Sequence, residues 1–173
     1  MSPLRLLTPA DLPQLVAVYR EAVLSQTPTL YTAEQVQAWA HHAGSSDALV
    51  EPLLTGYGLA SLGSQTGAED ALSIEAFGIL HPEDRLALLY CRGRSSRQGR
   101  AGTILSALEQ HAWSQGVARL RTEASQLSRP LLERRGWQVD AEETVLFAGT
   151  WFQRWRMVKA LATPGQPIPC PLP

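Results

Sequence analysis

The sequence has few cysteines, no long apolar run and almost no net charge, and each of these absences removes a class of protein. Cys91 and Cys170 stand far apart, so the chain lacks the cysteine spacing of a zinc site or of a disulfide framework. No stretch approaches the roughly 20 apolar residues that a membrane-spanning helix needs. Lys and Arg number 15 against 16 Asp and Glu, which argues against a nucleic-acid-binding surface. We therefore expect no metal, no membrane partner and no nucleic-acid partner.

The N-terminal residues 1–5 also lack the pattern of a signal peptide, in which charged residues precede an apolar segment. This predicts a cytoplasmic protein. A chain of 173 residues is long enough for one domain with a sizeable core. Because proline dominates its last residues, we predict a single folded domain over residues 1–161 and an extended or disordered tail over residues 162–173.

Hydrophobic periodicity and capping signals divide this domain into helices and strands. Thr8 with Asp11, and Thr32 with Gln35, have the spacing of a capping box. The predicted helices cover approximately residues 8–24, 32–44, 100–115 and 125–135. The predicted strands cover approximately residues 4–7, 57–62, 72–80, 86–91, 117–124, 137–139, 144–147 and 151–158. This order predicts a mixed α/β sheet with helices on both faces, in which the strongly apolar strand 86–91 is central and buried.

The most informative segment is the basic loop between strand 86–91 and the helix that begins near Arg100. A glycine-containing loop at a helix N-terminus favours anions, because the first helical N–H groups lack partners and the helix dipole is positive there. We expect Arg94, Arg97 and Arg100 to add mobile positive charge. The segment has neither the Gly-Lys-Ser/Thr of a P-loop nor the Gly-x-Gly of a dinucleotide-binding fingerprint. It predicts a seat for a phosphorylated ligand of another kind.

The apolar strand is followed by the run Ser96-Arg97-Gln98-Gly99-Arg100-Ala101. This run resembles the acyl-CoA loop of the GNAT N-acetyltransferase superfamily, whose pattern is Gln/Arg-x-x-Gly-x-Gly/Ala after a central strand. Gly99 and Ala101 match the pattern, while Ser96 occupies the Gln/Arg position. The resemblance continues in Leu88–Cys91, Leu105–Glu109 and Arg129–Trp137, and it extends over about residues 4–161.

The resemblance implies a fold, a co-substrate and a reaction. The fold is a mixed, mostly antiparallel sheet flanked by helices on both faces. The reaction is transfer of an acetyl group from acetyl-CoA to an amine of a small molecule or peptide, by direct attack in a ternary complex. The pantetheine arm would pair as an added strand with the backbone of Leu89, Tyr90 and Cys91. The pyrophosphate would lie on the backbone N–H groups of Arg97, Gln98, Gly99, Arg100, Ala101 and Gly102.

The family's usual proton-handling positions carry no such chemistry in this sequence. The family often has a tyrosine where Leu132 stands, and an acidic base where Ala87 and Leu88 stand. The residues that could substitute as proton donors or acceptors are Glu75, Glu123, His81 and Tyr90. We take the two glutamates as the candidate catalytic residues. The alternative function is a GNAT-like sensor or interaction protein that binds acyl-CoA with little or no catalysis.

Several of these residues also have a structural interpretation. Cys91 is either a nucleophile or a small buried apolar residue. Glu123 is either a base or the partner of Arg121 or Arg129. The aromatic side chains of Tyr19, Tyr31 and Trp39 either line an acceptor pocket or pack in the core. Near the C-terminus, Trp151, Phe152 and Trp155 are expected in the core or in contact with a second copy of the chain, as in a homodimer.

Overall fold

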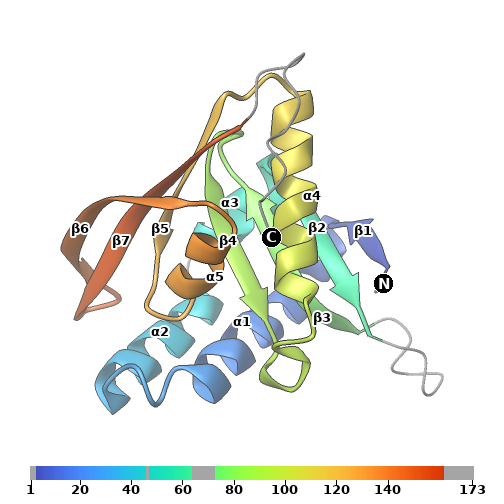
Figure 1. Cartoon of the computed structure of the whole chain (residues 1–173). Coiled ribbons are helices and arrows are strands. Elements are labelled where there is room, and N and C mark those ends of the chain that lie inside the picture. The colour runs from blue at the N-terminus through green and yellow to red at the C-terminus, as the bar shows by residue number, and fades with distance from the viewer. Residues whose placement is uncertain (1–2, 46, 64–72, 162–173) are drawn as a thin grey trace.

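The computed structural model describes residues 3–45, 47–63 and 73–161 (Figure 1). The helices are α1 (Leu12–Gln26), α2 (Ala33–Ser45), α3 (Asp47–Thr55), α4 (Arg100–Ser114) and α5 (Arg129–Arg134), with 3-10 turns η1 (Pro9–Asp11) and η3 (Gly93–Ser95). The strands are β1 (Leu4–Leu6), β2 (Tyr57–Leu62), β3 (Ile74–Leu80), β4 (Leu86–Cys91), β5 (Arg119–Ala124), β6 (Gln138–Phe147) and β7 (Thr150–Ala160). The tail predicted over residues 162–173 lies outside the described residues.

The strands form two antiparallel sheets, in the orders β1-β2-β3-β4 and β5-β7-β6. A single parallel bridge between Arg85 and Arg121 joins them. Below this bridge β4 and β5 separate, and the long hairpin of β6 and β7 extends to one side (Figure 1). The mostly antiparallel, mixed α/β architecture expected from the sequence is therefore confirmed.

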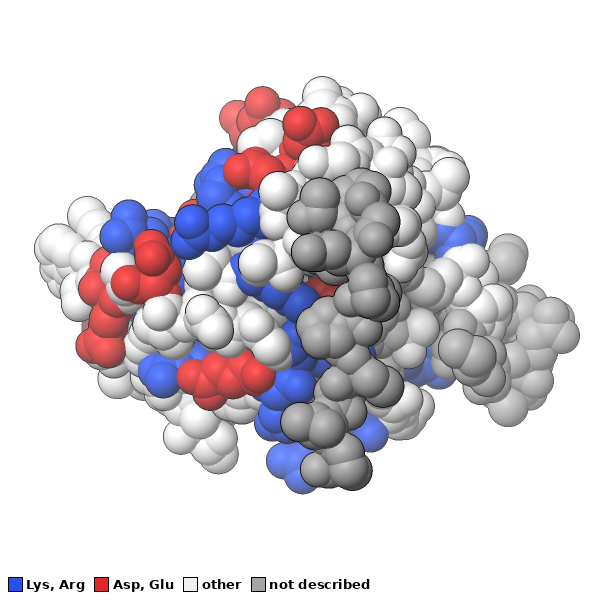
Figure 2. Space-filling model, turned by 45° about the horizontal axis from the view of Figure 1, so that its top comes forward, with Lys and Arg blue, Asp and Glu red and all other residues white. Residues whose placement is uncertain are grey.

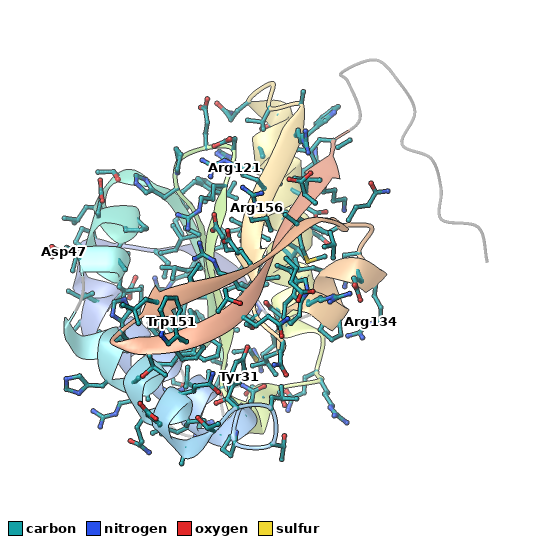
Figure 3. The ribbon with its side chains drawn as sticks, turned by 90° about the vertical axis from the view of Figure 1, so that its left-hand side faces the viewer. Tyr31, Asp47, Arg121, Arg134, Trp151 and Arg156 are labelled. Carbon is teal, nitrogen blue, oxygen red and sulfur yellow. The ribbon has the colours of Figure 1, made fainter. Side chains whose placement is uncertain are left out.

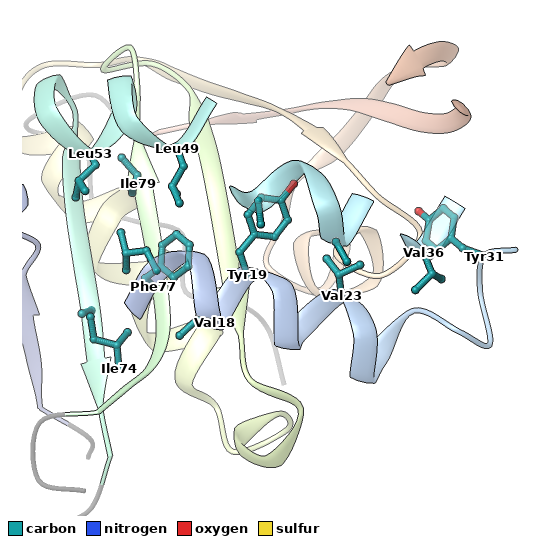
Figure 4. Packing of buried hydrophobic residues seen from close by; sticks show 14 of the residues in the cluster. Val18, Tyr19, Val23, Tyr31, Val36, Leu49, Leu53, Ile74, Phe77 and Ile79 are labelled. Carbon is teal, nitrogen blue, oxygen red and sulfur yellow. The ribbon is translucent and has the colours of Figure 1, made fainter. Parts of the chain in front are cut away.

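Helices cover both faces of the first sheet, as predicted, and each face has its own core. Helix α4 packs against β2, β3 and β4 on one side, while α1 packs against β3 and β4 on the other. The core on the α1 side contains Val18, Tyr19, Leu49 and Phe77, which Figure 4 shows between the helices and the sheet. Burial of such side chains contributes about 1.5–3 kcal/mol each to stability, so these two cores fix the framework around β4.

Local signals explain where the first helices begin. The backbone N–H of Thr32 donates to Oε1 of Gln35 at 3.0 Å, and the N–H of Gln35 donates to Oγ1 of Thr32 at 3.2 Å. The N–H of Thr8 donates to Oδ2 of Asp11 at 2.7 Å. Both predicted capping boxes are present. The first of them begins η1, which continues directly into α1.

Two elements differ from the sequence prediction. Helix α3 was not predicted, because Pro52 interrupts a short segment whose helical form depends on burying Leu49 and Leu53. Strands predicted at 137–139 and 144–147 are one continuous strand, β6. It pairs with β7 over its whole length, with one irregularity between Val139 and Ala141. Cross-strand pairing thus overrides the polar residues in the middle of β6.

The prediction that strand 86–91 is buried on both faces is wrong. Every residue of β3 is buried, whereas β4 has only Leu86 buried and the other five half-buried. The reason is that β4 is the last strand of the first sheet, and the second sheet diverges from it beyond Arg85. An apolar strand is left with a free edge.

Candidate active site

The free edge of β4 borders a gap between the two sheets. At its closed end, the N–H of Arg121 donates to the carbonyl oxygen of Asp84 at 2.9 Å. The hydroxyl of Thr122 donates to the carbonyl oxygen of Leu86 at 2.7 Å. Beyond these bonds no bridge joins β4 to β5 within the described part of the chain. The gap therefore opens toward the C-terminal ends of both strands.

Backbone alternation shows which residues of β4 face this gap. The N–H of Arg92 donates to the carbonyl oxygen of Glu75 at 2.8 Å, so residue 92 points toward β3. In an antiparallel ladder every second residue does the same, which directs the backbone groups of Tyr90 toward β3 and those of Leu89 and Cys91 toward the gap. Nε2 of Gln26 already donates to the carbonyl oxygen of Cys91 at 2.6 Å. Leu89 is thus the best placed residue to pair with an extended ligand.

The loop after β4 carries the backbone conformation of an anion site. Arg97 and Gly99 both have positive φ, of 59° and 79°. A Cβ at position 99 would meet no atom within 4 Å, so the space over this glycine is open. Gly99 is the N-cap of α4, and the N–H groups of the first helical turn lack partners within the helix. Such a run of outward N–H groups binds anions.

The expectation of three mobile arginines is wrong for two of them. Arg100 is only 8% exposed, and its Nη1 donates to Oγ of Ser61 at 2.9 Å and to the carbonyl oxygen of Leu62 at 2.7 Å. Its side chain leaves the inner side of the first turn of α4, so it points into the core. Arg94 is paired with the carboxylate of Glu75. Arg97 is exposed and has no ion pair among the residues that the structure describes.

Glu75, a candidate catalytic residue, lies on β3 and anchors this loop. Its side chain is 4% exposed. It accepts hydrogen bonds from Nε of Arg94 at 3.0 Å, from Oγ of Ser95 at 2.5 Å and from Oγ of Ser73 at 3.0 Å. Arg94 above all lowers the pKa of Glu75, from 4.5 to about 2. A carboxylate this acidic is a weak proton acceptor at neutral pH, so the geometry favours an anchoring role.

Glu123, the other candidate, lies across the gap on β5, and the structure does not bring it together with Glu75. Its side chain is 22% exposed. Nε and Nη2 of Arg85 donate to its Oε2 at 2.9 and 2.7 Å. No hydrogen bond to Oε1 is present within the described residues. Neither partner considered from the sequence is correct, because Arg121 pairs with Asp84 and Arg129 with Glu133.

The remaining titratable candidates are less suited to proton transfer. His81 is hydrogen-bonded to Thr55, with Nδ1 3.2 Å from Oγ1, in the connection between β3 and β4. Burial raises the pKa of Tyr90 well above 10, and its hydroxyl accepts a hydrogen bond from Nε1 of Trp39 at 3.2 Å. Burial also raises the pKa of Cys91 to about 11. A neutral thiol is a poor nucleophile, which favours the packing interpretation of Cys91.

Leu132 stands where the family often has a tyrosine. Its side chain is 1% exposed and lies in the core on the α4 side, so this position provides no hydroxyl at the gap. A different tyrosine stands nearby. The hydroxyl of Tyr31 accepts a hydrogen bond from the N–H of Gln126 at 2.8 Å, which ties the α1–α2 connection to the β5–α5 loop. Figure 3 shows Tyr31 beneath the β6–β7 hairpin, near the helices α1 and α2. No local sequence pattern indicates this contact, because the two partners lie 95 residues apart in the chain.

The aromatic residues divide between core and surface. Tyr19, Tyr31 and Trp39 pack in the α1-side core or against it, and the rings of Tyr31 and Trp39 are 5.5 Å apart, edge to face. Phe152 belongs to the same core, whereas Trp151 is 62% exposed at the end of the hairpin. An open hollow of about 440 Å³ beside the hairpin is lined by Leu30, Gln126, Arg129, Pro130, Glu133, Gln153 and Trp155.

Two antiparallel sheets that part at β4 and β5, beside a glycine-containing loop at a helix N-terminus, define an acetyltransferase fold. The family model described as "Acetyltransferase (GNAT) domain" matches residues 29–159, and the chain belongs to this family. The resemblance read from the sequence is thereby confirmed. A search of curated proteins gave no match.

Solved structures with the same fold cover almost the whole chain. A GCN5-related N-acetyltransferase from Rhodopseudomonas palustris is 24% identical, with a TM-score of 0.83 over 93% of this chain and 96% of that one. PaiA N-acetyltransferase from Thermoplasma acidophilum, in complex with coenzyme A, is 17% identical, with a TM-score of 0.64 over 92% and 99%. YncA from Salmonella typhimurium, solved with its cofactor acetyl-CoA, is 18% identical, with a TM-score of 0.60 over 98% and 99%.

The described residues contain neither a membrane-spanning helix nor a cluster of metal ligands. None of the helices there is both long and apolar enough to cross a membrane. The same residues contain no group of three His, Cys, Asp or Glu side chains able to hold a metal ion.

Proposed function

We propose that this protein transfers an acetyl group from acetyl-CoA to an amine of a small molecule or peptide. The observation that carries the proposal is the juxtaposition of a free strand edge at Leu89 with open N–H groups at Gly99. An extended arm with a diphosphate at one end fits both features at once. Membership of the GNAT family supports the same ligand.

The residues around the gap fit each part of acetyl-CoA. The backbone of Leu89 and Cys91 would pair with the pantetheine amides, with the carbonyl of Cys91 released from Gln26. The N–H groups from Arg97 to Gly102 would hold the diphosphate, and the exposed guanidinium of Arg97 would add positive charge. Gly99 leaves room for close approach of the phosphate oxygens.

The chemical step is direct attack in a ternary complex. The amine nitrogen forms a bond to the thioester carbonyl carbon, the carbon–sulfur bond breaks, and one proton leaves the nitrogen. We assign that proton to Oε1 of Glu123, directly or through water, because Arg85 occupies only Oε2. With Leu132 in the tyrosine position, the thiolate leaves as an anion and is protonated by water. A neutral Cys91 favours this route over an acetyl-cysteine intermediate.

Calorimetry with acetyl-CoA tests the binding half of the proposal. Saturable binding is expected, and a chain that binds no acetyl-CoA at millimolar concentration would contradict it. Release of free CoA thiol across a panel of amines then tests the transferase half. Tight binding without thiol release would instead support the alternative, an acyl-CoA sensor or interaction protein. The residues at Leu132 and Ala87 favour that alternative, since neither can move a proton. A cytoplasmic location and a homodimer remain predictions.

A further inference from the structure

Arg156 lies beside Glu123, the carboxylate that we assign as acceptor of the amine proton. The two residues stand directly opposite each other in the antiparallel pair of β5 and β7. Opposed residues direct their side chains to the same face of a sheet, with Cα atoms about 4.5–5.5 Å apart. Arg121, on the same strand as Glu123, shares this face. Figure 3 shows Arg121 and Arg156 in the same part of the fold, above the β6–β7 hairpin. An arginine therefore stands next to the proposed proton acceptor.

Arg156 carries a positive charge that no carboxylate of the described residues pairs with. The residue is exposed and forms no ion pair within the described ranges of the chain. Glu142 points to the opposite face, where Nε1 of Trp155 donates to its Oε2 at 3.1 Å. The acidic residues on or beside the face of Arg156 pair with other arginines: Glu123 with Arg85, Asp84 with Arg121, Glu143 with Arg154 and Asp140 with Arg119. Figure 2 shows acidic and basic side chains interspersed on the side of the molecule that carries the hairpin.

A guanidinium in this position influences which amines can react at Glu123. A nearby positive charge disfavours the ammonium form of a bound amine, and so eases the loss of its proton to the carboxylate. The same charge repels an acceptor that carries only positive charge. An acceptor with its own carboxylate removes this repulsion, because a carboxylate accepts two parallel hydrogen bonds from a guanidinium. The acceptor that fits is therefore an amine with a carboxylate close to it.

We propose that the acceptor is a free amino acid or a similar small amino carboxylate, whose carboxylate binds Arg156 while its amine faces Glu123. The inference rests on the proposed acetyl transfer. In the reaction the amine nitrogen forms a bond to the thioester carbon, the carbon–sulfur bond breaks, and the proton passes from the nitrogen to Glu123. The carboxylate on Arg156 takes no part in these bond changes. It holds the acceptor in place, and the product is an N-acetyl amino acid with its carboxylate intact.

Release of free CoA thiol from acetyl-CoA, measured with amino acids and with their carboxamides, tests the substrate class. An amino acid and its carboxamide have nearly the same shape, but only the amino acid has the negative charge. The readout is the ratio of kcat/KM for the two acceptors, compared between the unaltered protein and variants, so that the different basicity of the two amines cancels. Arg156→Ala should lower this ratio about tenfold, the value of one charged hydrogen-bonded contact. Arg156→Lys keeps the charge without the forked geometry, and it should lower the ratio less.

Arg134→Ala is the matched control. This arginine is also exposed and without an ion pair in the described part of the chain, but it lies on α5, apart from Arg156 in Figure 3. Its ratio should equal that of the unaltered protein. An unchanged ratio in Arg156→Ala would overturn the assignment, and so would thiol release with amines that lack a carboxylate but with no amino acid.

Calorimetry with amino acids in the presence of CoA gives a second readout that does not depend on turnover. Saturable binding is expected, and Arg156→Ala should weaken it about tenfold. A protein that binds acetyl-CoA but releases no thiol with any amine would contradict the proposed transferase function, whereas amino-acid binding that depends on Arg156 would still support this site. Amino-acid binding that is equally tight in Arg156→Ala would remove Arg156 from the site, whatever the outcome for the transferase.

Discussion

The two strands that border the gap differ in how much structure supports their polar groups. After β4, Arg94 and Ser95 are bonded to Glu75, Arg100 is bonded into the core, and Gly99 sets the turn. Across the gap, β5 brings one carboxylate, Glu123, held by a single arginine and partly exposed. The difference teaches that many contacts hold the loop proposed as the ligand seat, whereas the carboxylate proposed as proton acceptor has a single ion-pair partner among the described residues.

The largest effect is expected on stability, when Glu75, which anchors the loop after β4, is replaced. Glu75→Ala leaves a guanidinium and two hydroxyls without their shared acceptor, and it should lower the free energy of unfolding by about 3 kcal/mol. Urea denaturation measures this loss. Glu133→Gln, which removes one partner of the exposed pair with Arg129, is the control and should cost less than about 1 kcal/mol. Equal losses would mean that Glu75 is not a special anchor.

Lowering the pH should abolish the contribution of the Glu75 carboxylate to the free energy of unfolding. The pKa of Glu75 is about 2 in the folded protein, below its ordinary value of 4.5. Its contribution is therefore complete above pH 4.5 and is lost as the pH falls toward 2. Unfolding experiments at pH 7 and pH 3 should find a smaller gap between the unaltered protein and Glu75→Gln at the lower pH. A gap that does not shrink would show that the carboxylate is not stabilised as an anion.

On the opposite side of the gap, a substitution of Glu123 should change the rate of acetyl transfer. Glu123→Gln keeps the shape of the side chain but cannot accept the amine proton, and we expect kcat to fall about 100-fold. Affinity for acetyl-CoA should stay unchanged, since the contact lies on the β5 side. Glu143→Gln, which alters the pair with Arg154 on the hairpin, serves as control and should retain the rate. An unchanged kcat in Glu123→Gln would remove Glu123 from the mechanism.

The turn itself can be tested by comparing two glycines at opposite ends of α4. Gly99→Val forces a branched side chain into positive φ, at about 1–2 kcal/mol, and covers the phosphate seat. Acetyl-CoA affinity should fall about tenfold or more. Gly116→Val suffers the same backbone strain, since φ is 82° there and the space is open. It should lose similar stability but no affinity. Equal affinities for the two variants would mean that the loop is not the phosphate seat.

The smallest loss of stability is expected when the hydrogen bond between Tyr31 and Gln126 is removed. Tyr31→Phe removes the acceptor for the N–H of Gln126 and keeps the ring in the core. Stability should fall by about 1 kcal/mol, measured by thermal unfolding. Tyr57→Phe is a control, because the ring of Tyr57 stacks on His111 and Tyr57 lies on β2, which β3 separates from β4. A larger loss for Tyr57→Phe would argue against a supporting role for Tyr31.

The contrast between the two sides also decides what could be predicted from the sequence. Capping boxes, the helix beginning at Arg100 and the turn at Gly99 are local features, and they were predicted correctly. The burial of Arg100 was not, because its partners Ser61 and Leu62 lie on β2, almost 40 residues earlier. The Arg85 partner of Glu123 was missed for the same reason. Tertiary contacts of charged side chains leave no periodic signal in the sequence.

The free edge of β4 also bears on the solubility of the protein. An apolar strand with unpaired backbone groups is a template on which another chain can add a strand and begin to aggregate. Here α1 and α4 pack on the two faces of the sheet that ends at this edge, and the second sheet lies beside it. A polypeptide strand with side chains on both faces is broad, whereas an unbranched arm is narrow. The helices and the second sheet thus flank the edge with which, as proposed above, the narrow pantetheine arm would pair.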